Sequence, residues 1–248
     1  MKTALVTGAA RGIGLATTKL FSEQDWQVAM VDRDGEELLA ASEGLENVHP
    51  IATDVSDPDQ VAAMVAETLE ACGQIDAVVN NAGVADFGPI EDTTYERWKT
   101  VMATNLDGPF LCTQAAIPAL KATKGAIVNI ASISGLRAST LRVAYGTSKA
   151  AVIQLTLQQA AELGEYGIRA NAVAPGPVRT KLAMAVHSPE IIAAYHDAVP
   201  LNRYGSEREI AEAIVFLASD KASYITGQCL AADGGFEAVG IGLPALRG

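Results

Sequence analysis

Short runs of β-branched and other apolar residues alternate along this chain with longer stretches whose apolar residues recur at helical spacing. This order is typical of a parallel β-sheet that is covered by helices on both faces. The strand candidates are residues 3–7, 28–32, 48–54, 75–80, 126–132, 168–174 and 229–233. The helix candidates are residues 13–24, 35–44, 58–72, 94–121, 143–165 and 207–219. The pattern predicts a doubly wound α/β fold with a parallel sheet of about seven strands.

Two segments fall outside this alternation. Residues 176–206 lack clear periodicity, and because long loops in compact domains often serve as lids, we expect a substrate loop there. Residues 236–248 form an apolar, glycine-rich tail that suits packing against a neighbouring subunit or capping a pocket, with a frayed tail as the alternative. Since the 248 residues contain no linker or internal repeat, we expect a single domain, residues 1–248.

Composition and charge argue against several classes of protein. The chain is 49% hydrophobic and 19% charged, and no apolar run reaches the length that spans a bilayer. The N-terminal KTALVTG lacks the features of a signal peptide, so we expect a cytoplasmic protein. A net charge of −11 without a Lys/Arg cluster argues against nucleic acid or an anionic membrane as a partner. Cys72, Cys112 and Cys229 lack the spacing of a disulfide framework or a metal site, so no metal is expected.

The segment TGAARGIG, residues 7–14, directly follows the first strand candidate. Glycines at 8, 12 and 14 allow positive φ and let backbone N–H groups approach a phosphate at the start of the next helix. The spacing is GxxxGxG rather than GxGxxG, and a structural turn is the alternative. Asp32 favours the phosphate interpretation, because it ends the second strand candidate, where a carboxylate can accept both hydroxyls of an adenosine ribose.

Tyr145 and Lys149 lie four residues apart in a helix candidate, so they share one helix face. Ser132 ends the preceding strand candidate and therefore reaches the same carboxyl-end crevice. A nearby ammonium lowers the pKa of a phenol, so Tyr145 is expected to take a proton from an alcohol while Ser132 holds the oxygen and a nicotinamide accepts the hydride. Singly, the two helix residues would be a half-buried tyrosine and a solvated lysine, and only their combination with Ser132 favours catalysis.

Several further motifs stand in the order of a known family. They are NNAG at 80–83, YGTSK at 145–149, NAVAPGPVRT at 171–180 and ITGQCLAADGG at 225–235. With TGAARGIG, they make the chain resemble the short-chain dehydrogenase/reductase family from Lys2 to about Gly235. The resemblance implies a Rossmann-type fold and an oxidoreductase that acts on CH–OH groups.

The resemblance also implies roles for individual residues. The catalytic set would be Asn105, Ser132, Tyr145 and Lys149. Asn105 would steady a water beside Lys149, or else its amide would satisfy helix backbone at a kink. The cofactor set would be Gly8, Arg11, Gly12, Ile13, Gly14, Asp32, Asp54, Val55, Asn81, Ala82, Gly83, Tyr145, Lys149, Pro175, Gly176, Val178 and Thr180. In that set Asp54 and Val55 would meet the adenine, and the last four residues would close over the nicotinamide.

The charge of Asp32 favours NAD over NADP, because a carboxylate repels the 2′-phosphate of NADP and accepts the free ribose hydroxyls of NAD. Arg11 and Arg33 point the other way, since a basic residue in the glycine loop is common among relatives that prefer NADP. Arg33 could instead stack on the adenine or face solvent.

The expected substrate is a small molecule. Six side chains could face its pocket, although each of them alone would be a surface residue: Arg137, Arg142, His187, Tyr195, His196 and Arg203. So many hydrogen-bonding groups favour a polyhydroxylated or anionic substrate such as a sugar, a polyol or a sugar acid. We interpret the chain as an NAD-dependent dehydrogenase of a secondary alcohol. The alternatives are an NADPH-dependent 3-oxoacyl-type ketoreductase and a non-enzymatic nucleotide-sensing protein on the same fold.

The helix candidates 94–121 and 143–165 carry more apolar positions than one sheet-facing stripe needs. A second face would therefore meet a symmetry mate. By the resemblance, these helices pair as a four-helix bundle and dimers pair further through the C-terminal segment, which predicts a homotetramer, with a dimer as the alternative.

Overall fold

The computed structural model describes residues 1–239, except for the side chains of Leu182, Ala185 and Val186. All its strands join one seven-stranded parallel sheet in the order β3-β2-β1-β4-β5-β6-β7, which confirms the predicted fold class. The strands are β1 (Thr3–Thr7), β2 (Gln27–Asp32), β3 (Val48–Ala52), β4 (Ala77–Asn80), β5 (Ala126–Ile130), β6 (Arg169–Pro175) and β7 (Cys229–Ala232). The role expected of residues 240–248 concerns a segment outside the described residues.

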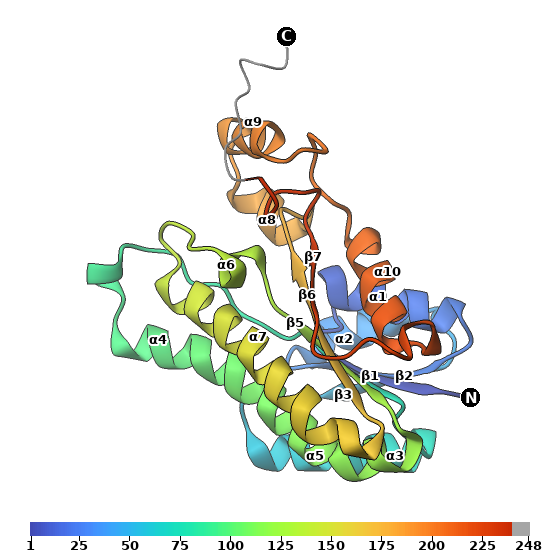
Figure 1. The fold of residues 1–248 in the computed structure, drawn as a ribbon. Helices are drawn as coiled ribbons and strands as arrows, with labels where there is room; N and C mark the ends of the chain where they lie inside the picture. The colour runs from blue at the N-terminus through green and yellow to red at the C-terminus, as the bar shows by residue number, and fades with distance from the viewer. Residues whose placement is uncertain (240–248) are drawn as a thin grey trace.

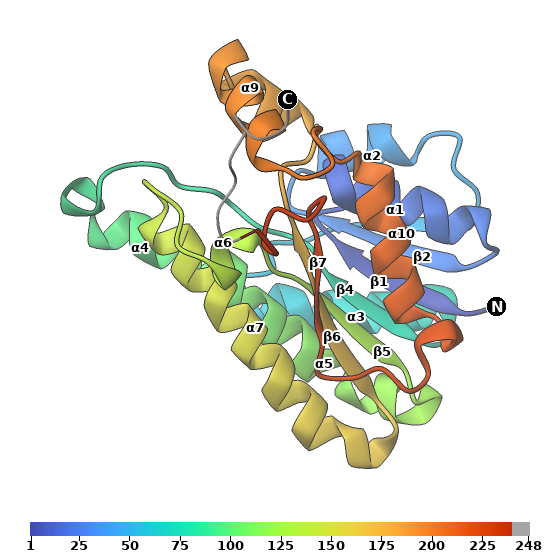
Figure 2. The same cartoon turned by 45° about the horizontal axis from the view of Figure 1, so that its top comes forward.

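Helices cover both faces of the sheet (Figure 1). One face carries α1 (Gly12–Glu23), α2 (Gly35–Ser42) and α10 (Glu207–Ala218), and α1 packs along α10. The other face carries α3 (Pro58–Cys72), α4 (Tyr95–Met102), α5 (Gly108–Thr123) and α7 (Val143–Leu163). Figure 2, turned by 45°, shows α7 lying along α5 on the side away from α10.

The hydrophobic core is divided by the sheet, because successive strand residues point to opposite faces. In β1, Ala4 and Val6 pack on the side of α1 and α10, and Leu5 packs on the side of α3 and α5. Every residue of β1 and β5 is buried. Burial on both faces explains why the strands appear in the sequence as continuous apolar runs.

The chain reverses its direction of travel across the sheet at β1. It runs from β1 through β2 to β3 at one edge and then returns to β4, on the other side of β1. In open α/β sheets, ligands bind at such a switch point, outside the carboxyl ends of the strands. Three short elements lie beyond these ends: α6 (Ile133–Leu136), α8 (Lys181–Val186) and α9 (Pro189–Ala198).

Two sequence-based expectations differ from the structure. The helix expected over 94–121 is interrupted by a π-helical turn, Ala103–Asp107, which separates α4 from α5. Residues 176–206 are not one irregular loop, because they contain α8 and α9. Thr180 and Ser188 start these two helices by accepting hydrogen bonds from Ala183 and Ile191 N–H groups. None of the described side chains of α9 is fully buried, so this helix lies outside the hydrophobic core.

None of the helices within residues 1–239 is both long and apolar enough to cross a membrane.

Candidate active site

The glycine loop after β1 is packed too closely for side chains at its key positions. Gly8 has φ +65°, and a Cβ there would lie 2.8 Å from Asn81 Nδ2 and 2.9 Å from Ala82 Cα. A Cβ on Gly14 would fall within 2.0 Å of the Gly8 carbonyl oxygen. The start of α1 thus lies directly against the loop, in the arrangement that presents helix N–H groups to a phosphate.

The segment after β4 fixes this loop in place. Asn81 Nδ2 donates to the carbonyl oxygens of Thr7 and Gly8, at 2.9 and 3.1 Å. Thr7 Oγ1 accepts from the N–H groups of Asn81 and Ala82, both at 3.0 Å. Asn81 therefore lines the cleft as expected, but its side-chain amide is used to position the loop.

Asp32 lies at the carboxyl end of β2 and faces the glycine loop. Its Oδ2 accepts from Ala10 N–H at 3.2 Å, and its Oδ1 accepts from Asp34 N–H at 3.1 Å. Arg11 pairs with Asp34 on the same rim, and this hydrogen bond raises the pKa of the Arg11 guanidinium. The positive charge of Arg11 is therefore already matched by a neighbouring carboxylate.

Ser132 and Tyr145 meet at the carboxyl end of β5. Ser132 starts α6, where its hydroxyl accepts a hydrogen bond from Ser134 N–H at 3.1 Å. Tyr145 is in the first turn of α7. Burial raises the pKa of its phenol, and this effect exceeds the lowering by the hydrogen bond with Ser132 and by the charge of Arg142.

Lys149 lies one turn further along α7 and is 4% exposed. Its Nζ donates to the Ile130 carbonyl oxygen at 2.6 Å and is 5.8 Å from the Tyr145 ring centroid. Burial lowers the pKa of the Lys149 ammonium to about 8, so it remains largely charged at neutral pH. The expectation that Lys149 lowers the pKa of Tyr145 differs from the structure, where the ammonium is bound to a carbonyl and burial of the phenol dominates.

Asn105 occupies the π-helical turn and is fully buried. Its Oδ1 accepts from Val84 N–H at 2.8 Å, and its Nδ2 donates to the Val84 carbonyl and to Ser148 Oγ. A Cβ on Gly83 would lie 3.3 Å from Asn105 Oδ1 and 3.6 Å from Lys149 Nζ, so the two groups share one small space. The amide satisfies backbone of the segment after β4 rather than backbone of its own helix.

One continuous cleft joins these groups. Its volume of about 2520 Å³ exceeds the ~300–1,000 Å³ of an ordinary small-ligand pocket and leaves room for a dinucleotide together with a second molecule. All the predicted catalytic and cofactor residues line it except Gly14 and Asn105. These two are buried behind the lining, where Gly14 allows the loop to pack and Asn105 holds Val84.

The other end of the cleft is lined by larger side chains. His187 Nδ1 hydrogen-bonds Tyr204 Oη at 2.9 Å, and the His187 ring stacks on Tyr195 with centroids 5.5 Å apart. Tyr195 also contacts Phe236, at 6.1 Å between centroids. This aromatic group joins α8, α9 and the C-terminal segment.

The six polar residues predicted for the pocket divide into two groups. Arg137, Arg142, His187 and Tyr195 line the cleft, whereas His196 and Arg203 do not. Arg203 pairs with Glu209 at the start of α10, at 2.6 Å. Arg137 binds the backbone carbonyl oxygens of Glu237 and Val239, so it holds the C-terminal segment against α6.

Capping of a pocket was one role expected of the tail that begins at residue 236, and Phe236 and Glu237 line the cleft. Sequence reasoning missed other lining residues, among them Phe87 and Leu141. Nothing in the local sequence marks them, because they come from irregular segments that only the fold brings to the cleft.

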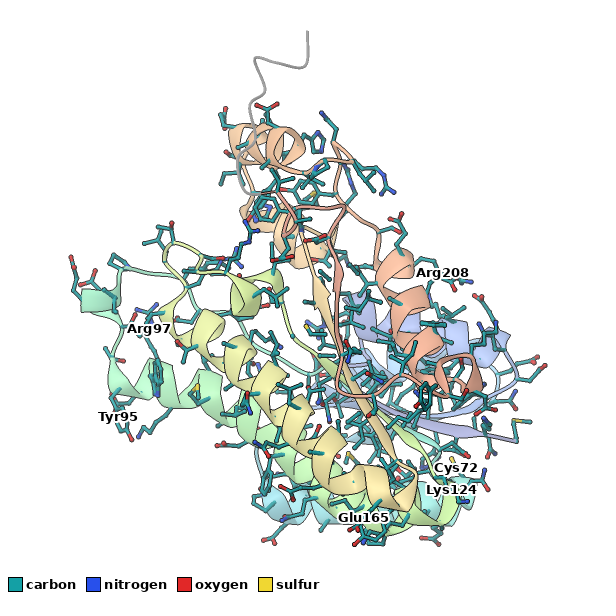
Figure 3. All side chains as sticks on the ribbon, in the orientation of Figure 1. Cys72, Tyr95, Arg97, Lys124, Glu165 and Arg208 are labelled. Carbon is teal, nitrogen blue, oxygen red and sulfur yellow. The ribbon has the colours of Figure 1, made fainter. Side chains whose placement is uncertain are left out.

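Cys72 lies at the end of the molecule opposite α8 and α9, as Figure 3 shows. Within residues 1–239, no three His, Cys, Asp or Glu side chains are grouped as they would be around a metal ion.

Comparison with known proteins places the chain in a family. The model described as enoyl-(acyl carrier protein) reductase, which represents short-chain dehydrogenases/reductases, matches residues 8–237. The chain is 40% identical over 246 residues to 2,5-dichloro-2,5-cyclohexadiene-1,4-diol dehydrogenase of Sphingobium indicum, covering 96% of this chain and 98% of that one. It is also 40% identical over 240 residues to a 3-oxoacyl-(acyl-carrier-protein) reductase of Chlamydia trachomatis, covering 94% and 96%.

A crystal structure of levodione reductase superposes with a TM-score of 0.92 at 33% identity, covering 96% of this chain and 98% of that one. The fold and these matches define a nicotinamide-dependent oxidoreductase that acts on CH–OH groups. The chain belongs to the short-chain dehydrogenase/reductase family.

Proposed function

We propose that this enzyme uses NAD and transfers a hydride between the nicotinamide and a secondary alcohol of a sugar, a polyol or a related hydroxy compound. One observation carries the proposal. Ser132, Tyr145 and Lys149 line the same cleft as the glycine loop and Asp32. The tight packing of Gly8 and Gly14 supports a bound dinucleotide, because it brings the start of α1, with its free N–H groups, directly against the loop.

Each residue of the proposed catalytic set has a distinct task. Ser132 holds the substrate oxygen by a hydrogen bond, and Tyr145 Oη exchanges the proton of the substrate hydroxyl. Lys149 keeps a positive charge beside the phenol, and Asn105 acts as a positioning residue through Val84 and Ser148. Bound NAD would accept or supply the hydride.

The preference for NAD rests on the charges around the adenosine end of the cleft. Asp32, Asp34 and Glu37 line this end, and their charges act on Arg11. Since Arg11 is paired with Asp34, a 2′-phosphate would meet an acidic rim. A free ribose would instead find the Asp32 carboxylate as an acceptor.

The substrate class rests on the far end of the cleft. His187 and Tyr195 combine ring faces with polar atoms, which suits a small molecule that has both an apolar ring or chain and hydroxyl groups. The name of the Sphingobium indicum relative describes a cyclic diol, which fits the same class.

The test is a screen for NADH formation across sugars, polyols, hydroxy acids and simple secondary alcohols, with NAD and NADP compared for each compound. We expect turnover with at least one polyhydroxylated or acidic compound and a higher kcat/KM with NAD. Turnover confined to simple alcohols, or a preference for NADP, would contradict the proposal.

The second candidate is an NADPH-dependent 3-oxoacyl ketoreductase. It is favoured by the similarity to the Chlamydia trachomatis reductase and by Arg33, which is exposed next to Asp32. Rapid NADPH oxidation with a 3-oxoacyl thioester, together with no activity on polyols, would select this function.

The proposal extends to the assembly and the location of the enzyme. We propose that residues 1–248 act as one catalytic domain and form a cytoplasmic homotetramer. Phe110 on α5 and Leu157 on α7 are 47% and 44% exposed, so the two helices present apolar surface outside the core. Light scattering should report about four times the chain mass of 25.8 kDa. A stable, active monomer would refute this part.

A further inference from the structure

Arg142 is placed at the reacting end of the cleft. It precedes α7, three residues before Tyr145, and its half-buried side chain lines the cleft. The guanidinium carbon is 4.7 Å from the Phe87 ring centroid and 5.8 Å from the Tyr145 ring centroid. These two rings contact the cation without using its N–H groups as ordinary donors.

Within residues 1–239, no hydrogen bond or ion pair joins the guanidinium of Arg142 to another residue, and its contacts are with the two rings. Two other arginines of the cleft are paired: Arg11 with Asp34, and Arg137 with the Glu237 side chain and the carbonyl oxygens of Glu237 and Val239. Arg33 and Arg179 also line the cleft, but both are exposed, so water can satisfy their donors. A guanidinium has five donors, and half-burial removes part of the water that would otherwise satisfy them. We therefore expect a hydrogen-bond acceptor inside the cleft to pair with the guanidinium of Arg142.

The backbone before Arg142 is strained in a way that fixes this position. Leu141 has φ +61°, a left-handed conformation that is unfavourable for leucine. Its carbonyl oxygen accepts a hydrogen bond from Gly88 N–H at 3.0 Å, which links the turn to the segment that carries Phe87. Strain of this kind tends to occur at binding and catalytic sites. The turn and the Phe87 ring together hold Arg142 over the cleft.

His187 adds a second polar group from the opposite side of the cleft. Burial and the charge of Arg142 lower the pKa of the His187 imidazole, which favours the neutral ring. Its Nδ1 is used by Tyr204 Oη. When Nδ1 accepts from that hydroxyl, Nε2 carries the proton and can donate to a ligand.

We propose that Arg142 binds a carboxylate of the substrate, which makes a small hydroxy acid or sugar acid the substrate class of this site. The inference rests on the proposed function and narrows it. One guanidinium matches one planar, singly charged carboxylate in a bidentate pair. Arg137, the nearest other arginine along the chain, is occupied by the C-terminal segment, which favours a singly charged group over a doubly charged one at Arg142. Because Arg142 lies against the Tyr145 ring, the acid and the reacting hydroxyl belong to one compact molecule.

The test compares substrates that differ only in a carboxylate or a CH2OH group. The pairs are 3-hydroxybutyrate with 1,3-butanediol, and gluconate with glucitol. For wild type we expect a higher kcat/KM for the acid of at least one pair. In Arg142→Gln the acid-to-alcohol ratio of kcat/KM should fall by about 10- to 100-fold, as is typical when a hydrogen-bonded charge pair is broken. Arg142→Lys should restore part of the ratio, since it returns the charge without the fork.

Arg208→Gln is the matched control, because it removes a cation that pairs with Glu23 and does not line the cleft. Its acid-to-alcohol ratio should stay within about threefold of wild type, the scatter expected of a distant charge. An equal loss of the ratio in both variants, or no loss in Arg142→Gln, would overturn the proposal. The proposal would also be overturned if the enzyme preferred a long 3-oxoacyl thioester and the acid-to-alcohol ratio of kcat/KM did not depend on Arg142.

A binding measurement separates this inference from the proposed function. The enzyme–NADH and enzyme–NADPH complexes are titrated with butyrate and 1-butanol, which lack the secondary hydroxyl and cannot be oxidised by a reduced cofactor. Butyrate should bind wild type more tightly than 1-butanol, and this advantage should disappear in Arg142→Gln. If no alcohol is oxidised but this pattern holds, the proposed function fails and the carboxylate site stands. If butyrate has no advantage in wild type, the carboxylate site is refuted.

Discussion

The two ends of the cleft are built in different ways. The dinucleotide end consists of strand termini and main-chain groups: Gly8 and Gly14 pack against each other, and Asp32 is fixed by two backbone N–H groups. The substrate end consists of long side chains from irregular segments and short helices, such as Phe87, Arg142 and His187. The first end is held by a buried sheet, whereas α9 at the second end contributes no fully buried side chain among those described.

This difference separates what the family shares from what is particular to this enzyme. Strand ends that are buried on both faces can hold main-chain donors in fixed positions for a common cofactor. Side chains on exposed elements can change without disturbing the core, so they are suited to select the substrate. We expect mutations at the dinucleotide end to affect binding and stability together, and mutations at the substrate end to affect selectivity.

The largest effect is expected where the two ends meet. Tyr145→Phe removes the transferable proton and should lower kcat by about 10²–10⁴-fold, since general acid–base catalysis contributes that much. NADH binding, measured by fluorescence titration, should remain within about threefold of wild type, because the ring is retained. Tyr166→Phe is the control, because Tyr166 is exposed and does not line the cleft. Retention of more than about a tenth of wild-type activity would refute the acid/base role.

Gly14→Ala tests the close packing of the dinucleotide end. The new Cβ would lie within 2.0 Å of the Gly8 carbonyl oxygen, so the loop must shift. We expect a loss of about 1–3 kcal/mol in the free energy of unfolding and at least a tenfold weaker NADH affinity. Gly164→Ala is the control, because a Cβ there would meet nothing within 4 Å. Equal behaviour of the two variants in denaturant unfolding and NADH titration would show that the loop tolerates a side chain.

Asp32→Ser tests the electrostatic basis of NAD selection. Removing the carboxylate should raise the ratio of kcat/KM for NADP over NAD by about 10-fold or more, because a repulsive charge of the order of 1–2 kcal/mol is lost. Glu36→Ser removes a carboxylate from α2 that does not line the cleft, and should leave the ratio nearly unchanged. An unchanged ratio in Asp32→Ser would mean that Asp32 serves only the backbone of the loop.

The smallest effect is expected at Glu209, which joins the segment before α10 to the first turn of that helix. Glu209 closes a capping box with Ser206 and pairs with Arg203, and these hydrogen bonds lower its pKa to about 2. The ionised carboxylate stabilises the fold above its unfolded pKa of about 4.3, and this stabilisation is lost as the pH falls towards 2. Because the side chain is half exposed, Glu209→Gln should lower Tm by only about 1–3 °C at pH 6.

The difference in Tm between wild type and Glu209→Gln should shrink as the pH is lowered from 6 to 3. Glu212→Gln removes an exposed partner of Arg208 from the same helix without touching the cap, and is the control. A difference that stays constant between pH 6 and pH 3 would show that the charge of Glu209 does not carry the effect.

Much of the dinucleotide end could be predicted from the sequence. The glycine loop, Asp32 and Ser132 all follow strands whose apolar runs are unmistakable, and the carboxyl ends of parallel strands must meet at one edge. The spacing of Tyr145 and Lys149 fixed their shared helix face. Their electrostatics could not be predicted, because the pKa of Tyr145 depends on its burial, and Lys149 is bound to a carbonyl of a different element.

By itself, the sequence determined the layered fold and the order of the motifs, because hydrophobic periodicity and strand-end chemistry are local properties of the chain. The tertiary structure decided which arginines are free to act. Arg137 and Arg142 are five residues apart in one irregular segment, yet the first is tied to Glu237 and the second lies between Phe87 and Tyr145 with its donors unused. Phe87 is 55 positions from Arg142 and Glu237 is 100 positions from Arg137, so no local pattern encodes this difference.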